Sequence, residues 1–205
     1  MSVATFHVVR YPPAYRGTAA SRMYLDRAPL RNTSGLQFWR LLGTARGRSM
    51  SLSVDPDRWA MFAVWDDERA LATFLATSDI AARWHREASE ACTVRLAYGG
   101  GHGLWGGVFP FAGERPASLA GAPVAVLTRA AIRFRRLPRF YRAVPAIETL
   151  LAGQAGVRRS LGAGEWPLAR QATFSLWEDH AAVTAFAWEG SAHREVIRRT
   201  RREDW

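Results

Sequence analysis

The sequence contains no lysine, a single cysteine and no long apolar run. Because Cys92 is the only cysteine, an internal disulfide and a metal cluster built on cysteines are excluded. No run of about 18 apolar residues is present, which argues against a helix that crosses a bilayer. The opening residues, MSVATFHVVRYPPAY, lack the basic region and the small-residue cleavage site of a signal peptide. We therefore expect a cytoplasmic protein.

All 28 basic residues are arginines, and the formal net charge is +10. We attribute the absence of lysine to a GC-rich genome, and the sequence has no helix-turn-helix, zinc-finger or RNP-type motif, so we expect no nucleic-acid partner. The arginines form two clusters, at 133, 135, 136, 139 and 142, and at 194, 198, 199, 201 and 202. Guanidinium groups bind planar oxyanions at two points, so the clusters suit phosphate, an anionic membrane surface or the carboxylates of a cofactor. The alternative is a solvated helix face.

Two parts of the chain match each other at a nearly constant spacing. FAVWDDERALATF (62–74) aligns with FSLWEDHAAVTAF (174–186) at an offset of 112 residues, with tryptophan and phenylalanine in register. Further upstream, GLQFWRLLG (35–43) aligns with GVRRSLGAG (156–164) at an offset of 121 residues. The chain is therefore an internal repeat in which one connection is nine residues shorter in the second copy.

Each copy predicts the order strand, helix, strand, strand, helix. Residues with period-two hydrophobicity open the copies at 5–11 and 124–133, and helices are expected near 15–26 and 137–151. Acidic residues follow the tryptophan in both WDDERALATFL and WEDHAAVTAFA, where they favour a helix start. The first copy ends in a strand at 92–98, which has no counterpart before Trp205. This order is ferredoxin-like, so we predict an α+β fold whose tandem repeats form a pseudo-twofold barrel.

The predicted organisation has three parts: a first repeat at 1–98, a linker at 99–122 and a second repeat at 123–205. The linker is rich in glycine and proline but contains Trp105, Phe109 and Phe111. Aromatic residues in a linker indicate that it packs on another part of the protein. It either covers an open end of the barrel or lies on the surface.

Among five histidines, His193 has the setting most suggestive of a ligand. On a helix it shares one stripe with Phe186 and Ile197, so its ring should point toward the sheet. A buried imidazole needs a partner, which can be a backbone carbonyl, a carboxylate or a metal. Of the others, His85 on a helix of the first copy is the main competitor, and His7 on a strand is expected to be an ordinary satisfied side chain.

The second half resembles the spheroidene monooxygenase family of carotenoid biosynthesis. The resemblance is carried by PVAVLTRAAIR (123–133), RFYRAVP (139–145), QATFSLWED (171–179) and FAWEGSAHREVIRRTRREDW (186–205). The first half is similar through GLQFWRLLGT (35–44), AVWDD (63–67) and WGGVFPF (105–111). The sequence departs from the family after GLQFWRLLGT, where Ala45, Arg46 and Arg48 stand in place of glycines, so the edge of the pocket is expected to differ.

This resemblance implies a haem-binding oxidoreductase of the dimeric α+β barrel type, a monooxygenase that inserts oxygen into an apolar substrate. It implies haem b as cofactor, with His193 as the iron ligand and Phe186 and Ile197 beside the group. Arg129 and Arg133 match a strand of the family, and by alternation they share one face of it. They are therefore candidates for pairing with haem propionates, and Arg129 also for catalysis on the distal side. The expected mouth of the substrate pocket is formed by Phe38, Trp39, Trp105 and Phe111.

Two other functions are compatible with the same resemblance. The first is haem chemistry on nitrogen, such as aldoxime dehydration or oxidation of an N–O compound, which the barrel's other relatives perform. The second is a haem-binding protein without catalysis. The partners expected are a small apolar substrate and an external electron donor. Peripheral contact with a membrane and assembly into a homo-oligomer are also compatible with the sequence.

Overall fold

The computed structural model describes residues 1–48, 53–111, 121–166 and 170–188. Among them, residues 1–42 and 56–111 form a first compact unit, and residues 43–48, 53–55, 121–166 and 170–188 form a second. The described part of the expected linker, 99–111, thus packs with the first unit, while the segment after Leu42 packs with the second. In the described part of the chain, no helix has the length and hydropathy needed to cross a bilayer.

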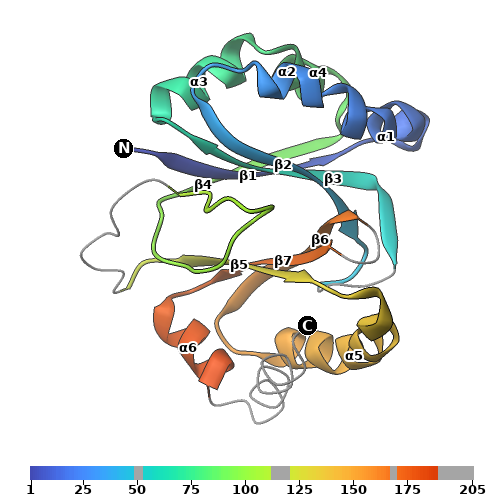
Figure 1. The fold of residues 1–205 in the computed structure, drawn as a ribbon, viewed down its shortest axis with the longest axis vertical. Helices are drawn as coiled ribbons and strands as arrows, with labels where there is room; N and C mark the ends of the chain where they lie inside the picture. Colours follow the sequence, from blue (N-terminus) through green and yellow to red (C-terminus); the bar gives the residue numbers. More distant parts are fainter. Residues whose placement is uncertain (49–52, 112–120, 167–169, 189–205) are drawn as a thin grey trace. The chain divides into compact units, whose positions relative to one another are not determined.

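The first unit is a four-stranded antiparallel sheet with helices on one face (Figure 1). Its elements are β1 (Val3–Arg10), α1 (Arg16–Leu25), α2 (Arg27–Arg31), β2 (Leu36–Ala45), β3 (Val54–Trp65), α3 (Glu68–Thr77), α4 (Asp79–Glu87) and β4 (Glu90–Leu96). The strand order is β4-β1-β3-β2, the ferredoxin-like order. The predicted helix at 15–26 and strand at 92–98 are confirmed to within a few residues.

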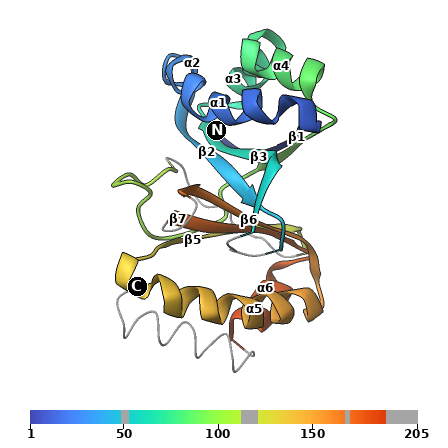
Figure 2. The ribbon, with the colours of Figure 1, turned by 90° about the vertical axis from the view of Figure 1, so that its right-hand side faces the viewer.

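The second unit repeats this arrangement with strands in the order β6-β7-β5. Its elements are β5 (Val124–Ala131), the short helix η2 (Phe134–Arg136), α5 (Leu137–Gly153), β6 (Val157–Trp166), β7 (Arg170–Trp177) and α6 (His180–Trp188). Helices α5 and α6 lie on one face of these strands (Figure 2). Pro138 stands in the first turn of α5, where a proline is tolerated because its missing N–H would have no helical partner.

Both repeats use the same joint, a glycine immediately before the second strand that contacts the residue just after the third strand. Gly35 and Gly156 have φ of 74° and 83°, in the region that favours glycine. Their carbonyls accept hydrogen bonds of 2.8 Å from the backbone of Asp66 and Glu178. A Cβ on either glycine would lie 2.5 or 2.6 Å from the Cβ of an alanine in the following helix. The internal repeat inferred from the sequence is therefore confirmed at atomic detail.

The helix after each joint is also capped and anchored alike. The carboxylates of Asp67 and Asp179 accept backbone hydrogen bonds of 2.8 Å from the third residue along, which fixes the start of α3 and α6. Trp65 contacts Phe74 of α3 with ring centroids 4.9 Å apart, and Trp177 contacts Phe186 of α6 at 5.2 Å. The aromatic pairs that align in the sequence are thus the contacts between sheet and helix.

Candidate functional site

The second sheet presents two chemically different faces. Trp177 contacts Phe186 of α6, and Gln171 is hydrogen-bonded to Tyr141 of α5, so the odd-numbered residues of β7 face the helices. Strand pairing extends this face to its neighbours on β5 and β6. Trp177 and Val124 lie at one end of this face, and its middle carries Val126, Thr128 and Ala130 on β5, Ser160, Gly162 and Gly164 on β6, and Gln171, Thr173 and Ser175 on β7. Apart from Gln171, the side chains between the helices and the middle of this sheet are small.

The matching face of the first sheet carries much larger residues. Trp39 and Leu41 of β2 and Met61 of β3 pack into the helix-side core of the first unit. At the repeat offsets of 121 and 112 residues, their counterparts are Ser160, Gly162 and Thr173. The first layer is filled by its own side chains, whereas the strands of the second layer contribute little volume to theirs. A broad, flat group therefore fits the second unit better than the first.

Tyr141 and Gln171 are the polar groups that α5 and β7 bring together in this layer. Gln171 is only 4% exposed, so its amide needs a partner inside the protein. Burial raises the pKa of the Tyr141 hydroxyl, and the hydrogen bond with Gln171 opposes that shift. The tyrosine is therefore neutral at ordinary pH. Sequence reasoning missed both residues, although RFYRAVP and QATFSLWED, which contain them, were singled out.

Arg129 lies on the other face of the second sheet. It is paired in register with Ala172, one position away from Gln171, so its side chain points away from α5 and α6. Its Nε is 3.6 Å from Oε1 of Glu165, and both side chains are about one-fifth exposed (21% and 19%). Arg129 and Phe186, which the sequence analysis placed beside one group, are therefore on opposite faces of the sheet.

Arg133 does not continue the face of Arg129, because β5 ends at Ala131. Arg133 follows the buried Ile132, is exposed, and stands just before η2. The expectation that the two arginines share a strand face is thus corrected, since the strand stops before the alternation reaches position 133. His193 and Ile197, the predicted iron ligand and its neighbour, lie outside the described residues.

Three of the four residues expected at the substrate pocket lie together in the first unit. Phe38 and Trp105 have ring centroids 5.7 Å apart, and Phe111 belongs to the same cluster through Phe62. Phe62 is stacked on Trp105 at 5.4 Å, with an angle of 9° between the ring planes. We call Phe38, Phe62, Trp105 and Phe111 the aromatic cluster. The sequence analysis missed Phe62, which faces away from the helices on β3.

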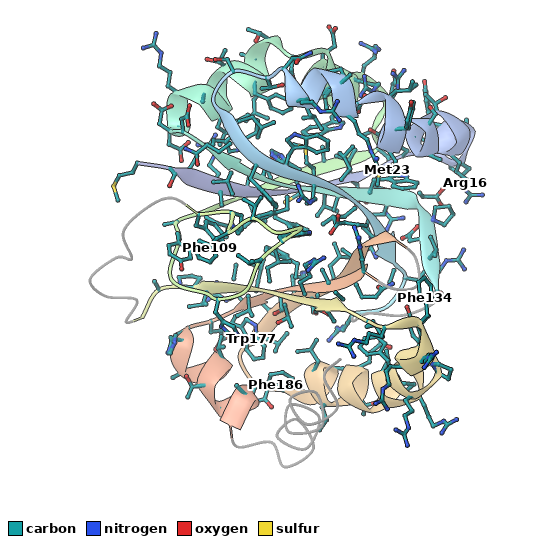
Figure 3. All side chains as sticks on the ribbon, in the orientation of Figure 1. Arg16, Met23, Phe109, Phe134, Trp177 and Phe186 are labelled. Carbon is teal, nitrogen blue, oxygen red and sulfur yellow. The ribbon has the colours of Figure 1, made fainter. Side chains whose placement is uncertain are left out.

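Trp39 is separated from this cluster by strand alternation. Phe38 and Trp39 are neighbours on β2, so their side chains point to opposite faces, and Trp39 packs on the helix-side core. Arg40, two residues after Phe38 on the same strand face, contacts the aromatic cluster instead, and its guanidinium carbon is 4.2 Å from the centre of the Phe38 ring. Its Nη2 donates a hydrogen bond of 3.1 Å to the carbonyl of Trp105. Arg40 thus fixes the 99–111 segment on the sheet. Phe109, in the same segment, is partly exposed (Figure 3).

The first unit also buries ionisable groups that no sequence motif indicated. Arg83 of α4 forms an ion pair with Asp26, and both side chains are 8% exposed. Burial raises the pKa of Asp26, and Arg83 opposes that shift. A cavity of about 40 Å³ beside Asp26 is also lined by Tyr11 and Arg22. This volume accommodates only a few water molecules, so it is no substrate site.

His7 is buried at the helix side of β1 and only half satisfied. Its Nδ1 is 2.9 Å from Oγ1 of Thr93, while Nε2 has no hydrogen-bond partner among the described residues. The ring lies against Trp84, with centroids 5.1 Å apart, and burial lowers its pKa to about 4. The expectation of an ordinary satisfied side chain is therefore corrected for one of its two nitrogens. His85, the competitor of His193, is exposed near the end of α4.

No protein-family model matches the chain. Spheroidene monooxygenase of Rhodobacter capsulatus is 33% identical over 211 residues, which cover the whole chain and 86% of that protein. The chain belongs to the spheroidene monooxygenase family. The enzyme of the same name from Rubrivivax gelatinosus is 34% identical over 90% of the chain and 72% of its own length. The enzyme of the same name from Cereibacter sphaeroides is 35% identical over 82% of the chain and 52% of its own length, so the chain spans about half of that relative.

Membership of the spheroidene monooxygenase family supports an oxidoreductase of the monooxygenase class. The fold is also similar to a crystal structure of aldoxime dehydratase, with a TM-score of 0.56, 13% identity, and coverage of 98% of this chain and 76% of that chain. This similarity confirms the predicted fold class, α+β with tandem ferredoxin-like repeats of the dimeric α+β barrel type. At that level of identity the similarity shows the fold alone.

The residues of the second unit can be compared with the needs of a haem, the group that the family resemblance implies. In the described part of the chain, no three His, Cys, Asp or Glu side chains gather as a metal site. A haem needs one axial side chain rather than such a cluster. It also needs a broad slot, and the small residues on the helix side of β5, β6 and β7 occupy less volume than their counterparts in the first unit. The strands of the second unit therefore leave more room for such a group than the strands of the first unit do.

Proposed function

We propose that the protein is a haem-dependent monooxygenase that inserts oxygen into an apolar substrate, with haem b held on the helix side of the second sheet. The observation that carries this proposal is the replacement of Trp39, Leu41 and Met61 by Ser160, Gly162 and Thr173 at matching positions. Membership of a monooxygenase family supplies the reaction class.

In this proposal His193 is the iron ligand and Ile197 lies beside the group. Phe186, which contacts Trp177, contributes an apolar wall to the same layer. Bound haem would supply the activation of dioxygen, with electrons from an external donor. The small residues of β6 and β7 leave room for the ring, and Tyr141 with Gln171 offers a neutral polar pair at its side. These residues bind, orient and keep water out, which is the part of catalysis that the protein performs.

Arg129 has a different place in this proposal from the one expected. Its side chain is on the sheet face away from the helices, and it faces the carboxylate of Glu165. It therefore does not pair with the propionates of a haem bound on the helix side. Arg133 is exposed beyond the end of β5, just before η2, so it remains our candidate for pairing with a propionate.

The aromatic cluster is our candidate for the apolar substrate surface. Its rings lie on the face of the first sheet that carries no helix, and Trp105 is only 5% exposed. The rings stacked and edge-on around Phe62 form a continuous apolar cluster, in which the indole N–H of Trp105 and the guanidinium of Arg40 on Phe38 are the hydrogen-bonding side-chain groups. Such a surface suits a long hydrocarbon chain better than a polar substrate.

The ligand assignment is tested by the absorption spectrum of the purified protein reconstituted with haem. We expect a Soret band that His193→Ala largely abolishes. His85→Ala and His180→Ala serve as matched controls, because both residues are exposed on helices, and both variants should retain the band. A His193→Ala protein that keeps the wild-type spectrum would overturn the assignment of the ligand.

The location of the group is tested separately by filling the second layer. Gly162→Leu and Thr173→Met introduce the residues that the first repeat has at the matching positions, Leu41 and Met61. We expect the double variant to fold with an unchanged circular dichroism spectrum and to bind much less haem. Leu127→Met, on the opposite face of β5, is the control and should bind haem normally. Normal haem binding by the filled variant would refute the proposed location.

Turnover assays distinguish the reaction class from the alternatives. A monooxygenase consumes oxygen only when an electron donor is present, whereas dehydration of an aldoxime consumes no reductant. A haem protein whose spectrum does not respond to added ligands and which turns over nothing would support simple haem binding. We expect oxygen consumption that depends on both the donor and an apolar substrate.

A further inference from the structure

The described part of the second unit has a strongly charged segment at η2 and the start of α5. From Ala131 to Ile147 the sequence carries five arginines and no acidic residue. Four of them are exposed, and three of these, Arg135 in η2 and Arg139 and Arg142 in α5, follow each other at spacings of four and three residues. On a helix this spacing places them on one side. We call these three residues together with Phe134 the α5 basic face.

The α5 basic face points away from the sheet. The opposite side of α5 carries Val144 and Leu151, which are buried at 8% and 4% exposure, and Tyr141, which is hydrogen-bonded to Gln171 of β7. Side chains tipped with nitrogen project outward from the first turns of α5 (Figure 3). The arginines are therefore exposed on the outside of the second unit.

An exposed aromatic side chain accompanies these charges. Phe134, in the short helix η2 just before α5, is 66% exposed. It stands beside the charged stripe at the end of the helix, as Figure 3 shows. Arginines next to an exposed phenylalanine are the composition of a surface that lies in the headgroup region of a bilayer.

The neighbouring loop contacts the other side of α5, where Glu148 follows Val144 by one helical turn. The backbone N–H of Arg48 donates a hydrogen bond of 2.7 Å to Oε1 of Glu148, the first acidic residue of α5. Gly47 makes this approach feasible, because a Cβ there would lie 2.1 Å from the same oxygen. The contact engages the Glu148 carboxylate and holds the exposed Arg46 and Arg48 next to α5. These are two of the residues at which the sequence departs from its family.

We propose that the α5 basic face docks on the surface of an anionic phospholipid bilayer, with Phe134 entering the headgroup region. Each arginine near such a surface strengthens binding by about fivefold, from roughly 1 kcal/mol per basic residue. The attraction is screened within about a Debye length, so docking weakens as salt is added. The proposal does not depend on haem or on the identity of the substrate.

The test is co-sedimentation of the full chain with vesicles of phosphatidylcholine, with and without phosphatidylglycerol. We expect binding only when the anionic lipid is present and only at low or moderate salt. Arg139→Glu with Arg142→Glu should weaken binding by at least about 25-fold, at fivefold per arginine. Phe134→Ser should weaken the binding that survives at higher salt.

A matched control is Arg31→Glu with Arg69→Glu, two exposed arginines of the first unit. Both double variants lower the formal net charge from +10 by the same four units. A difference between them therefore reports the effect of the α5 basic face and not of the net charge. Equal loss in the two double variants, or no loss in the α5 variant, would overturn the proposal. Displacement of the vesicles by a DNA or RNA oligonucleotide at equal phosphate concentration would also overturn it, in favour of a nucleic-acid surface.

The outcome is distinguishable from that of the proposed function. The Soret band of the reconstituted α5 variant should equal that of the wild-type chain, because none of its changed residues faces the sheet. Loss of vesicle binding with an intact Soret band supports the docking surface alone. A wild-type chain that binds vesicles but no haem would refute the proposed function and leave the docking surface in place.

Discussion

Gly156→Ala tests the joint that the two repeats share. Gly156 connects α5 to β6 and has a φ of 83°. A Cβ at this position would lie 2.6 Å from the Cβ of Ala182 in α6, a distance at which one of the two segments must move. The backbone cannot shift freely, because its carbonyl accepts a hydrogen bond from Glu178 at 2.8 Å. The substitution therefore meets both backbone strain and overpacking.

The expected loss of stability can be worked out from these two contributions. A left-handed backbone costs a non-glycine residue about 1–2 kcal/mol. Overpacking in a well-packed contact typically costs about 1–3 kcal/mol. Together they predict a decrease of about 2–5 kcal/mol in the free energy of unfolding. Gly35→Ala, with φ of 74° and a contact of 2.5 Å to Ala70, should cost a similar amount in the first unit.

The measurement is denaturant unfolding followed by circular dichroism and tryptophan fluorescence. Gly17→Ala in α1 is the control, because a Cβ there meets nothing within 4 Å, and it should stabilise the helix by about 0.5–1 kcal/mol. Repeating Gly156→Ala in an Ala182→Gly background isolates the contact from the backbone strain. A Gly156→Ala protein within about 0.5 kcal/mol of the wild type would refute the reasoning, since that is the range of neutral surface changes.

Two further predictions concern the buried ionisable groups of the first unit. Arg83→Met should destabilise the chain by about 3–5 kcal/mol by leaving Asp26 unpaired in the interior, and adding Asp26→Leu should restore most of the loss in the same denaturant assay. Equal stability of the single and double variants would contradict this. Burial lowers the pKa of His7 from 6.5 to about 4, so its contribution is fully present above pH 6.5 and is lost as the pH falls toward 4. The pKa shift corresponds to a loss of about 3 kcal/mol in the free energy of unfolding over this pH range, and the His7→Gln variant should lack that loss. An unchanged pH dependence in the variant would show that His7 does not cause it.

The repeat and most elements were predictable because they depend on local patterns. The sequence shows strands of period two, acidic helix starts and the aligned pairs Trp65 with Phe74 and Trp177 with Phe186. The structure has these features at the same positions. The aromatic cluster was also predictable in part, since WGGVFPF and GLQFW stood out. Phe62 was not identified, because nothing local distinguishes it from other core residues of β3.

The candidate site was predicted less well, because it depends on where strands end and which way side chains point. Arg129 and Arg133 looked equivalent by alternation, but β5 stops at Ala131. Phe38 and Trp39 are adjacent in the chain and lie on opposite faces of β2. The pairing of Asp26 with Arg83 joins residues 57 positions apart, a distance over which no motif carries information.

The sequence by itself determined the tandem ferredoxin-like fold and the family, because hydrophobic period, capping residues and glycines with required backbone angles act over a few positions. Only the tertiary structure decided which face of each sheet a residue occupies and what it meets there. That choice depends on the pairing register of strands far apart in the chain, where a shift by one residue would exchange the two faces. For this reason the filled layer of the first unit and the small-residue layer of the second are properties of the folded chain and not of any local motif.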